Sequence, residues 1–63
     1  MFEVITIDFN GYKKICLASD SKDLIKTAYK TYIKRCLYGS PDIQEIRITK
    51  NGETVTAFIN WRR

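Results

Sequence analysis

Residues 21–37, SKDLIKTAYKTYIKRCL, decide the fold of this chain. Apolar residues recur in this stretch as neighbouring pairs every four positions, which is the period of an amphipathic helix. Asp20 or Ser21 can cap the start of the helix, and Gly39 can end it. The pattern therefore predicts a helix whose buried side carries Leu24, Ile25, Ala28, Tyr29, Tyr32, Ile33, Cys36 and Leu37.

A β-hairpin is predicted on each side of this helix. The dipeptide Asn-Gly occurs at residues 10–11 and 51–52, and between alternating segments it is the strongest short-range signal for a two-residue type I′ turn. Such a turn at 51–52 places Ile46 opposite Ala57 on the inner face and Phe58 on the outer face. The order hairpin, helix, hairpin predicts an α+β fold of the ββαββ type, with one helix packed on one face of a four-stranded, largely antiparallel sheet. The strand order stays open.

The first hairpin has two apolar faces. Pairing about its Asn-Gly turn places Val4 and Leu17 on one face and Ile5 on the other. A single helix covers only one face of a small sheet, so the second apolar face is expected to meet another protein or a second copy of the chain. The same register sets Asp8 opposite Lys13 as a cross-strand ion pair.

Composition limits the functions that the chain can have. With 63 residues, of which 44% are apolar and 29% charged, the chain is expected to form one small domain, residues 1–63. It has no histidine, and its two cysteines are too few for a disulfide framework and lack the spacing of a zinc site. Its carboxylates are scattered, so no enzyme activity, cofactor or metal is expected. No apolar stretch approaches the roughly 20 residues of a membrane span, and a cytoplasmic protein without membrane contact is expected.

The net charge of +4 lies in the predicted helix, and outside it six basic residues balance six acidic ones. Lysines spaced four residues apart keep one surface positive for an anionic partner, such as the phosphates of a nucleic acid. Lys and Thr are also ordinary residues of a solvated helix face, although most such faces contain interspersed acids, so both interpretations stay open. The candidates for phosphate binding are Lys22, Lys26, Lys30, Lys34 and Arg35, which Asp23 alone offsets within the helix.

Exposed aromatic residues are the candidates for a protein interface, because Tyr, Trp, Phe and Arg are favoured at binding hot spots. Tyr38 lies just beyond the last apolar residue of the predicted helix. Trp61, beside two arginines, suits base stacking with phosphate pairing, and it equally suits the apolar face of the last strand. The predicted interface consists of Tyr38, Arg47, Phe58 and Trp61.

The phrases MFEVITIDFNGYKK and TKNGETVTAFINWRR, with a composition rich in Ile, Lys, Asn and Tyr, resemble the small early proteins of T-even-type bacteriophages. Among these, size and the strand-helix-strand pattern are most similar to the Dmd-type antitoxins, which bind and silence host RNase toxins. The resemblance implies a phage accessory protein that inhibits a host toxin or defence nuclease in the host cytoplasm. The alternative from the residues is a nucleic-acid-binding module that uses the basic face of the helix.

Overall fold

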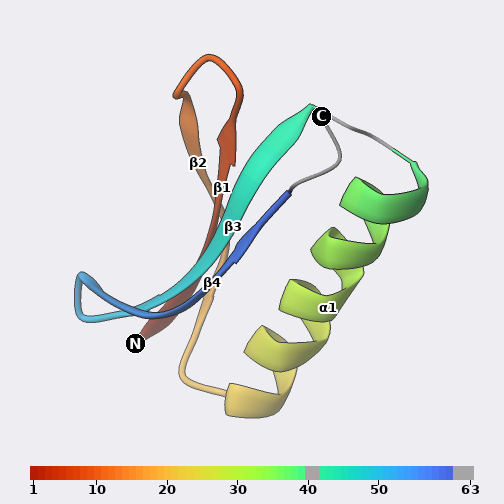
Figure 1. Cartoon of the computed structure of the whole chain (residues 1–63). Helices are drawn as coiled ribbons and strands as arrows, with labels where there is room; N and C mark the ends of the chain where they lie inside the picture. The colour runs from red at the N-terminus through yellow and green to blue at the C-terminus, as the bar shows by residue number, and fades with distance from the viewer. Residues whose placement is uncertain (40–41, 61–63) are drawn as a thin grey trace.

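The computed structural model describes residues 1–39 and 42–60, and in them a four-stranded antiparallel sheet carries one helix on one face (Figure 1). The elements are β1 (Phe2–Asp8), β2 (Lys13–Ser19), α1 (Lys22–Tyr38), β3 (Ile43–Lys50) and β4 (Glu53–Ile59). The predicted fold class is thereby confirmed. The strand order, which the sequence left open, is β2-β1-β3-β4, so β2 and β4 are the edges of the sheet.

The helix α1 begins and ends close to the predicted residues. The Oγ atom of Ser21 accepts a hydrogen bond from the backbone N–H of Leu24 at 3.4 Å, so Ser21 rather than Asp20 caps the helix. At the other end, the backbone N–H of Gly39 donates to the carbonyl oxygen of Arg35 at 2.9 Å. The helix packs on β1, β2 and β3, which leaves β4 at the margin of the covered area.

The core lies between α1 and the middle of the sheet. Val4 on β1 and Ile46 on β3 are fully buried, and Ile25 is the most buried side chain of the helix at 2% exposure. Half-buried side chains surround this centre, so the core is one thin layer, as expected of so short a chain. The buried cluster consists of Val4, Ile25, Cys36, Ile46 and Ile48, and the half-buried residues packed against it are Phe2, Leu17, Ala28, Tyr29, Tyr32, Ile33, Ile43 and Phe58.

The turn of the second hairpin has the predicted geometry. Asn51 and Gly52 both have positive φ, 53° and 86°, as a type I′ turn requires. Next to the turn, Thr49 pairs with Thr54, which is the register that a two-residue loop sets. The Asn-Gly signal is therefore confirmed at this turn.

Farther along the second hairpin the predicted register is wrong by one residue, because Val55 is an extra residue in β4 and forms a β-bulge. Ile46 consequently pairs with Phe58 instead of Ala57. The shift brings Phe58 to the helix side of the sheet, where it packs against the core. Ala57 and Ile59 move to the face that α1 does not cover, which we call the open face. The bulge buries Phe58, the larger apolar side chain, in place of Ala57.

The first hairpin closes through a wider loop than predicted. Asp8 Oδ1 accepts hydrogen bonds from the backbone N–H groups of Asn10 and Tyr12, both at 2.9 Å, and the Asp8 carbonyl oxygen accepts from the N–H of Gly11 at 3.0 Å. Gly11 has a positive φ of 84° whereas Asn10 does not, so the predicted type I′ turn is wrong here. Lys13 pairs with the residue before Asp8. The predicted ion pair of Asp8 with Lys13 is also wrong, because the carboxylate binds the loop amides.

A bulge in β2 turns Cys16 toward the helix. Ile5 pairs with Ile15 across the first hairpin, and Cys16 is the extra residue. Its Sγ atom lies 3.5 Å from the Oγ1 atom of Thr6. A hydrogen bond with Cys16 raises the pKa of the Tyr32 hydroxyl, and burial raises it further. The bulge therefore places a thiol under α1 and leaves Ile15 on the open face.

The fully buried Ile46 is expected to contribute strongly to stability. Replacing Ile46 with Ala should lower the free energy of unfolding by about 2–5 kcal/mol, since the change removes buried methyl groups and leaves a cavity. Ile48→Val removes a smaller group and should lower the free energy of unfolding by about 0.5–1.5 kcal/mol. This variant still tests the assignment of the core if Ile46→Ala fails to fold. Val55→Ala, at a residue that is 59% exposed, is the control. Urea unfolding followed by circular dichroism gives the values, and equal losses for Ile46→Ala and Val55→Ala would contradict this assignment of the core.

The buried thiol of Cys36 predicts a loss of stability at alkaline pH. Burial raises the pKa of this thiol, and the residue is only 5% exposed. The unfolded chain therefore releases the proton at lower pH than the folded chain, and the free energy of unfolding should fall as the pH rises past the ordinary thiol pKa of about 8.5. Urea midpoints at about pH 7 and about pH 9 measure this fall. Cys36→Ala should show a smaller fall than the natural chain, and an equal fall would contradict the prediction.

Candidate functional site

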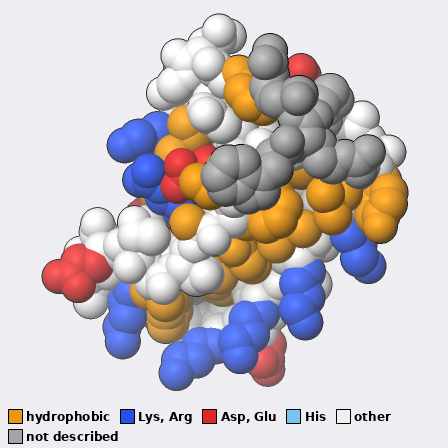
Figure 2. Space-filling model, viewed as in Figure 1, with side chains coloured by type: hydrophobic (Ala, Val, Ile, Leu, Met, Phe, Trp, Pro, Cys, Tyr) orange, Lys and Arg blue, Asp and Glu red, His pale blue; other side chains and the backbone are white. Residues whose placement is uncertain are grey.

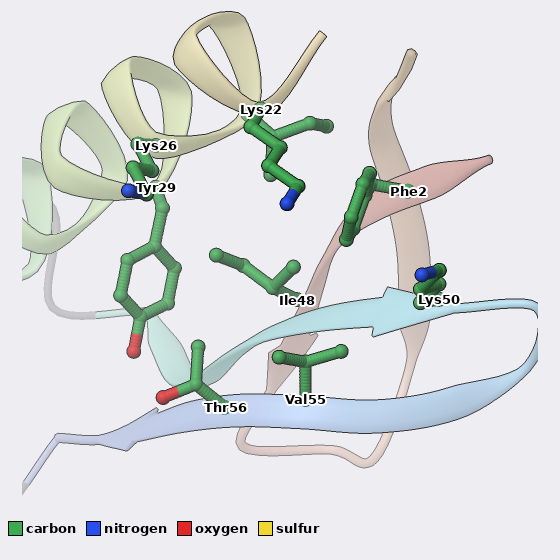
Figure 3. Close-up of a pocket in the computed structure, with 9 residues that line it drawn as sticks. Phe2, Lys22, Lys26, Tyr29, Ile48, Lys50, Val55 and Thr56 are labelled. Carbon is green, nitrogen blue, oxygen red and sulfur yellow. The ribbon is translucent and has the colours of Figure 1, made fainter. Parts of the chain in front are cut away.

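A groove of about 530 Å³ lies between the first half of α1 and the strands β1, β3 and β4 (Figure 3). It exists because α1 packs on β1, β2 and β3, so that part of the inner side of β4 has no helix above it. The floor of the groove is apolar and is formed by Phe2, Ile25, Ile48 and Val55. Val55 points to the helix side of β4, and because Val55 is the extra residue of the bulge, Thr56 points to the same side, as the close-up shows.

Three lysines line the same groove. Lys22 and Lys26 come from the first two turns of α1, and Lys50 comes from the end of β3. The Nζ atom of Lys50 lies 5.5 Å from the centroid of the Phe2 ring, within the range of a cation–π contact. Among the described residues that line the groove, none is acidic. The groove therefore combines an apolar floor with a positive rim, and Figure 2 shows Lys and Arg side chains bordering an apolar strip on this side of the molecule.

Two hydroxyl groups add hydrogen-bonding capacity to the groove. Tyr29 extends from α1 toward Thr56 on β4, as seen in the close-up (Figure 3). Tyr29 is half-buried and Thr56 is exposed. A ligand that lies along the floor can thus meet neutral donors at one place and ammonium groups at another.

The predicted phosphate-binding residues are all exposed, but they do not share one straight line. Each step of four residues turns the row by about 40° around the helix axis, because successive residues are about 100° apart. Lys22 and Lys26 therefore border the groove, whereas Lys30 and Lys34 lie farther round the helix. Arg35 contacts the ring of a neighbouring tyrosine, with its Cζ atom 5.2 Å from the ring centroid.

The open face of the sheet is a second candidate surface. Cross-strand pairing orders its side chains into rows, in which apolar residues surround one arginine. Ile15 and Ile59 are 58% and 39% exposed, and they lie on the two edge strands. In the strand order β2, β1, β3, β4 the rows are Ala18, Glu3, Thr49 and Thr54, then Ile15, Ile5, Arg47 and Ala57, then Lys13, Ile7, Glu45 and Ile59.

The polar groups in the middle of the open face satisfy one another. The guanidinium of Arg47 donates two hydrogen bonds to Glu45, from Nε to Oε2 and from Nη2 to Oε1, the latter at 3.4 Å. The hydrogen bond to Glu45 raises the pKa of Arg47. Thr49 donates from its Oγ1 to Oε1 of Glu3 at 3.4 Å. The two central charges of this face, those of Arg47 and Glu45, are therefore already paired within the chain.

The structure does not bring the predicted interface residues together. Tyr38 is 83% exposed at the end of α1, Arg47 lies on the open face, and Phe58 lies on the opposite, helix side. Trp61 lies outside the described residues. Sequence reasoning missed the exposure of Ile59 on the open face, because the bulge in β4 reverses the faces and alternation alone does not reveal a bulge.

Two further kinds of site were sought in residues 1–39 and 42–60. In that part of the chain, no three His, Cys, Asp or Glu side chains gather closely enough to hold a metal ion. A helix long and apolar enough to cross a membrane is not found there either.

Comparisons of the chain with protein-family models, with curated proteins and with solved structures find no match. The candidate surfaces therefore rest on the geometry of this chain: the groove with three lysines between α1 and β4, and the open face with the Arg47–Glu45 ion pair among apolar side chains.

Proposed function

We propose that this chain is a small binding protein that docks on another protein through the open face of its sheet and inhibits that protein by covering a surface that it needs. The observation that carries the proposal is the exposure of Ile15 and Ile59 on a sheet face that α1 leaves uncovered. Ile5 and Ile7 on β1 and Ala57 on β4 add further apolar side chains to this face, and an exposed apolar surface with polar residues around it is typical of interaction sites.

The polar centre of the open face supports a protein partner. Arg47 and Glu45 already form an ion pair with two hydrogen bonds, so both keep a charged partner when water is removed from them. A paired charge costs less to bury than an unpaired one. The apolar residues around the pair supply the area that becomes buried, and arginine is enriched in such interfaces. The face suits a flat protein surface.

The resemblance to small early phage proteins supports a host nuclease, of the toxin or defence kind, as the partner. An inhibitor that covers a surface of its target needs a shape that fits this surface and enough affinity to stay bound, and it needs no catalytic group. The host cytoplasm is then the place of action. A second copy of this chain could also occupy the open face, so the test must distinguish a homodimer from a complex with a host protein.

Ile15→Lys should abolish inhibition while the fold is kept, because Ile15 is already 58% exposed and a lysine at an apolar contact leaves a buried charge without a partner. Each of a panel of host RNase toxins is co-expressed with the protein, and cell growth and pull-down are measured. Leu24→Lys is a matched control, since Leu24 is 57% exposed and lies on α1, away from the open face.

Rescue of growth by the natural chain and by Leu24→Lys, and its loss in Ile15→Lys, is the expected result. The proposal fails if no toxin in the panel is silenced, or if both variants rescue equally well. Light scattering measures the oligomeric state. A dimer of the natural chain that becomes a monomer in Ile15→Lys would assign the open face to a second copy of the chain.

Nucleic-acid binding is a second candidate, which the five exposed cations of α1 favour. Asp23 is the one acidic residue of this helix. Five phosphate contacts predict an affinity that falls several hundred-fold, about 10²–10³, between about 50 and 200 mM salt. Lys30→Gln with Lys34→Gln should weaken RNA binding in fluorescence anisotropy and reduce the salt slope by about 2.

The matched control is Lys13→Gln with Lys14→Gln, which removes the same charge from exposed positions on β2. Equal effects of the two double variants would show attraction by net charge alone. Negligible RNA binding at low salt would reject this second candidate.

A further inference from the structure

We infer that the groove between α1 and β4 is a binding site for a medium-chain fatty carboxylate, whose alkyl chain lies on the apolar floor and whose carboxylate lies among Lys22, Lys26 and Lys50. The inference goes beyond the proposed function, because it concerns the opposite side of the sheet and a small ligand. It stands or falls independently of the open face.

The floor of the groove suits an alkyl chain. Its branched aliphatic side chains come from Ile25, Ile48 and Val55, and the ring of Phe2 extends this apolar surface. Lys50 lies over the ring of Phe2, which makes this ring a poor stacking platform for a flat aromatic ligand. The volume of about 530 Å³ is within the roughly 300–1,000 Å³ of small-ligand sites. An alkyl chain therefore matches both the shape and the chemistry of the floor.

The rim of the groove selects an anionic head group. Lys22, Lys26 and Lys50 are exposed and line the same cavity from two elements, with Lys22 between the other two in the close-up (Figure 3), so a carboxylate in the groove lies beside ammonium groups that can donate charge-assisted hydrogen bonds. Among the described residues of the lining there is no acid to neutralise them. A neutral alcohol of the same length gains the apolar contact but lacks the charge-assisted hydrogen bonds.

The place of the charges relative to the floor distinguishes this site from a general basic surface. The lysines farther along α1 turn away from the groove, whereas Lys22 and Lys26 stand directly above Ile48 and Tyr29 in the close-up (Figure 3). A phosphate backbone uses charge without an apolar floor. The union of three cations with buried apolar surface points to an amphiphile.

The first experiment titrates the ¹⁵N-labelled chain with sodium dodecanoate below its critical micelle concentration. Amide shifts are expected to gather at Phe2, Tyr29, Ile48, Val55 and Thr56, which line the groove. In calorimetry, affinity should rise about fourfold for each methylene between octanoate and dodecanoate. Decanol should bind about tenfold or more weakly than decanoate.

Two variants test the two halves of the site. Replacing Lys22, Lys26 and Lys50 together with Gln should weaken dodecanoate binding about tenfold or more. Val55→Asp should also weaken it, since it puts a carboxylate on the floor at a position that is 59% exposed and tolerates a polar side chain. Circular dichroism establishes that each variant is folded.

The control variant replaces Lys13, Lys14 and Lys34 with Gln. It removes the same net charge from exposed residues that do not line the groove, and its affinity for dodecanoate should equal that of the natural chain.

Several outcomes overturn the inference. These are amide shifts outside the groove, equal affinity for decanol and decanoate, equal losses in the two triple lysine variants, or no binding at all. Binding to phosphatidylglycerol vesicles without binding to monomeric dodecanoate would assign the lysines to a membrane surface. Displacement of dodecanoate by a short oligouridylate at stoichiometric amounts would assign them to nucleic acid.

Discussion

The structure depends on one constraint, which is that, within residues 1–39 and 42–60, one helix of 17 residues has to cover a sheet of four strands. The helix α1 packs on β1, β2 and β3, and the core forms where these three strands meet it. The inner side of β4 then has room above it, which becomes the groove. The outer side of the sheet has no helix in the described part of the chain, and it becomes the open face. Both candidate surfaces thus follow from incomplete coverage.

The two β-bulges determine which residues each surface displays. Val55 in β4 and Cys16 in β2 are each one extra residue, and each reverses the alternation that follows it. Without the bulge in β4, Phe58 would lie on the open face and Ala57 beneath the helix. With it, Phe58 joins the core. The larger apolar side chain is buried, which is the arrangement that the hydrophobic effect favours.

The sequence predicted the parts of the fold that local chemistry decides. Ser21 caps α1, and Asn51 with Gly52 forms the type I′ turn, because each depends on a few adjacent residues. The first Asn-Gly pair failed as a predictor because Asp8 forms a different loop with backbone amides nearby. Registers beyond the turns failed because packing against a distant helix decides them, and alternation in one strand contains no information about that helix.

The candidate sites show the same division between local and distant information. Lys22 and Lys26 were predicted as exposed cations from their spacing on the helix. Their relation to Lys50 was not predictable, since β3 and α1 meet only through the sheet topology. Thr49 and Glu3, which share a hydrogen bond on the open face, are likewise brought together by the pairing of β1 with β3.

The distribution of charge gives the two surfaces different chemistry. On the open face, Arg47 binds Glu45 and leaves little net field, so affinity there has to come from apolar area and shape. At the groove, three lysines have no acid among the described lining residues, so a ligand there needs an anion as well as an apolar body. Phe2 and Ile48 belong both to the packing around the core and to the floor of the groove. A ligand on that floor therefore extends a thin core, and its binding is coupled to folding because the unfolded chain has no floor to offer.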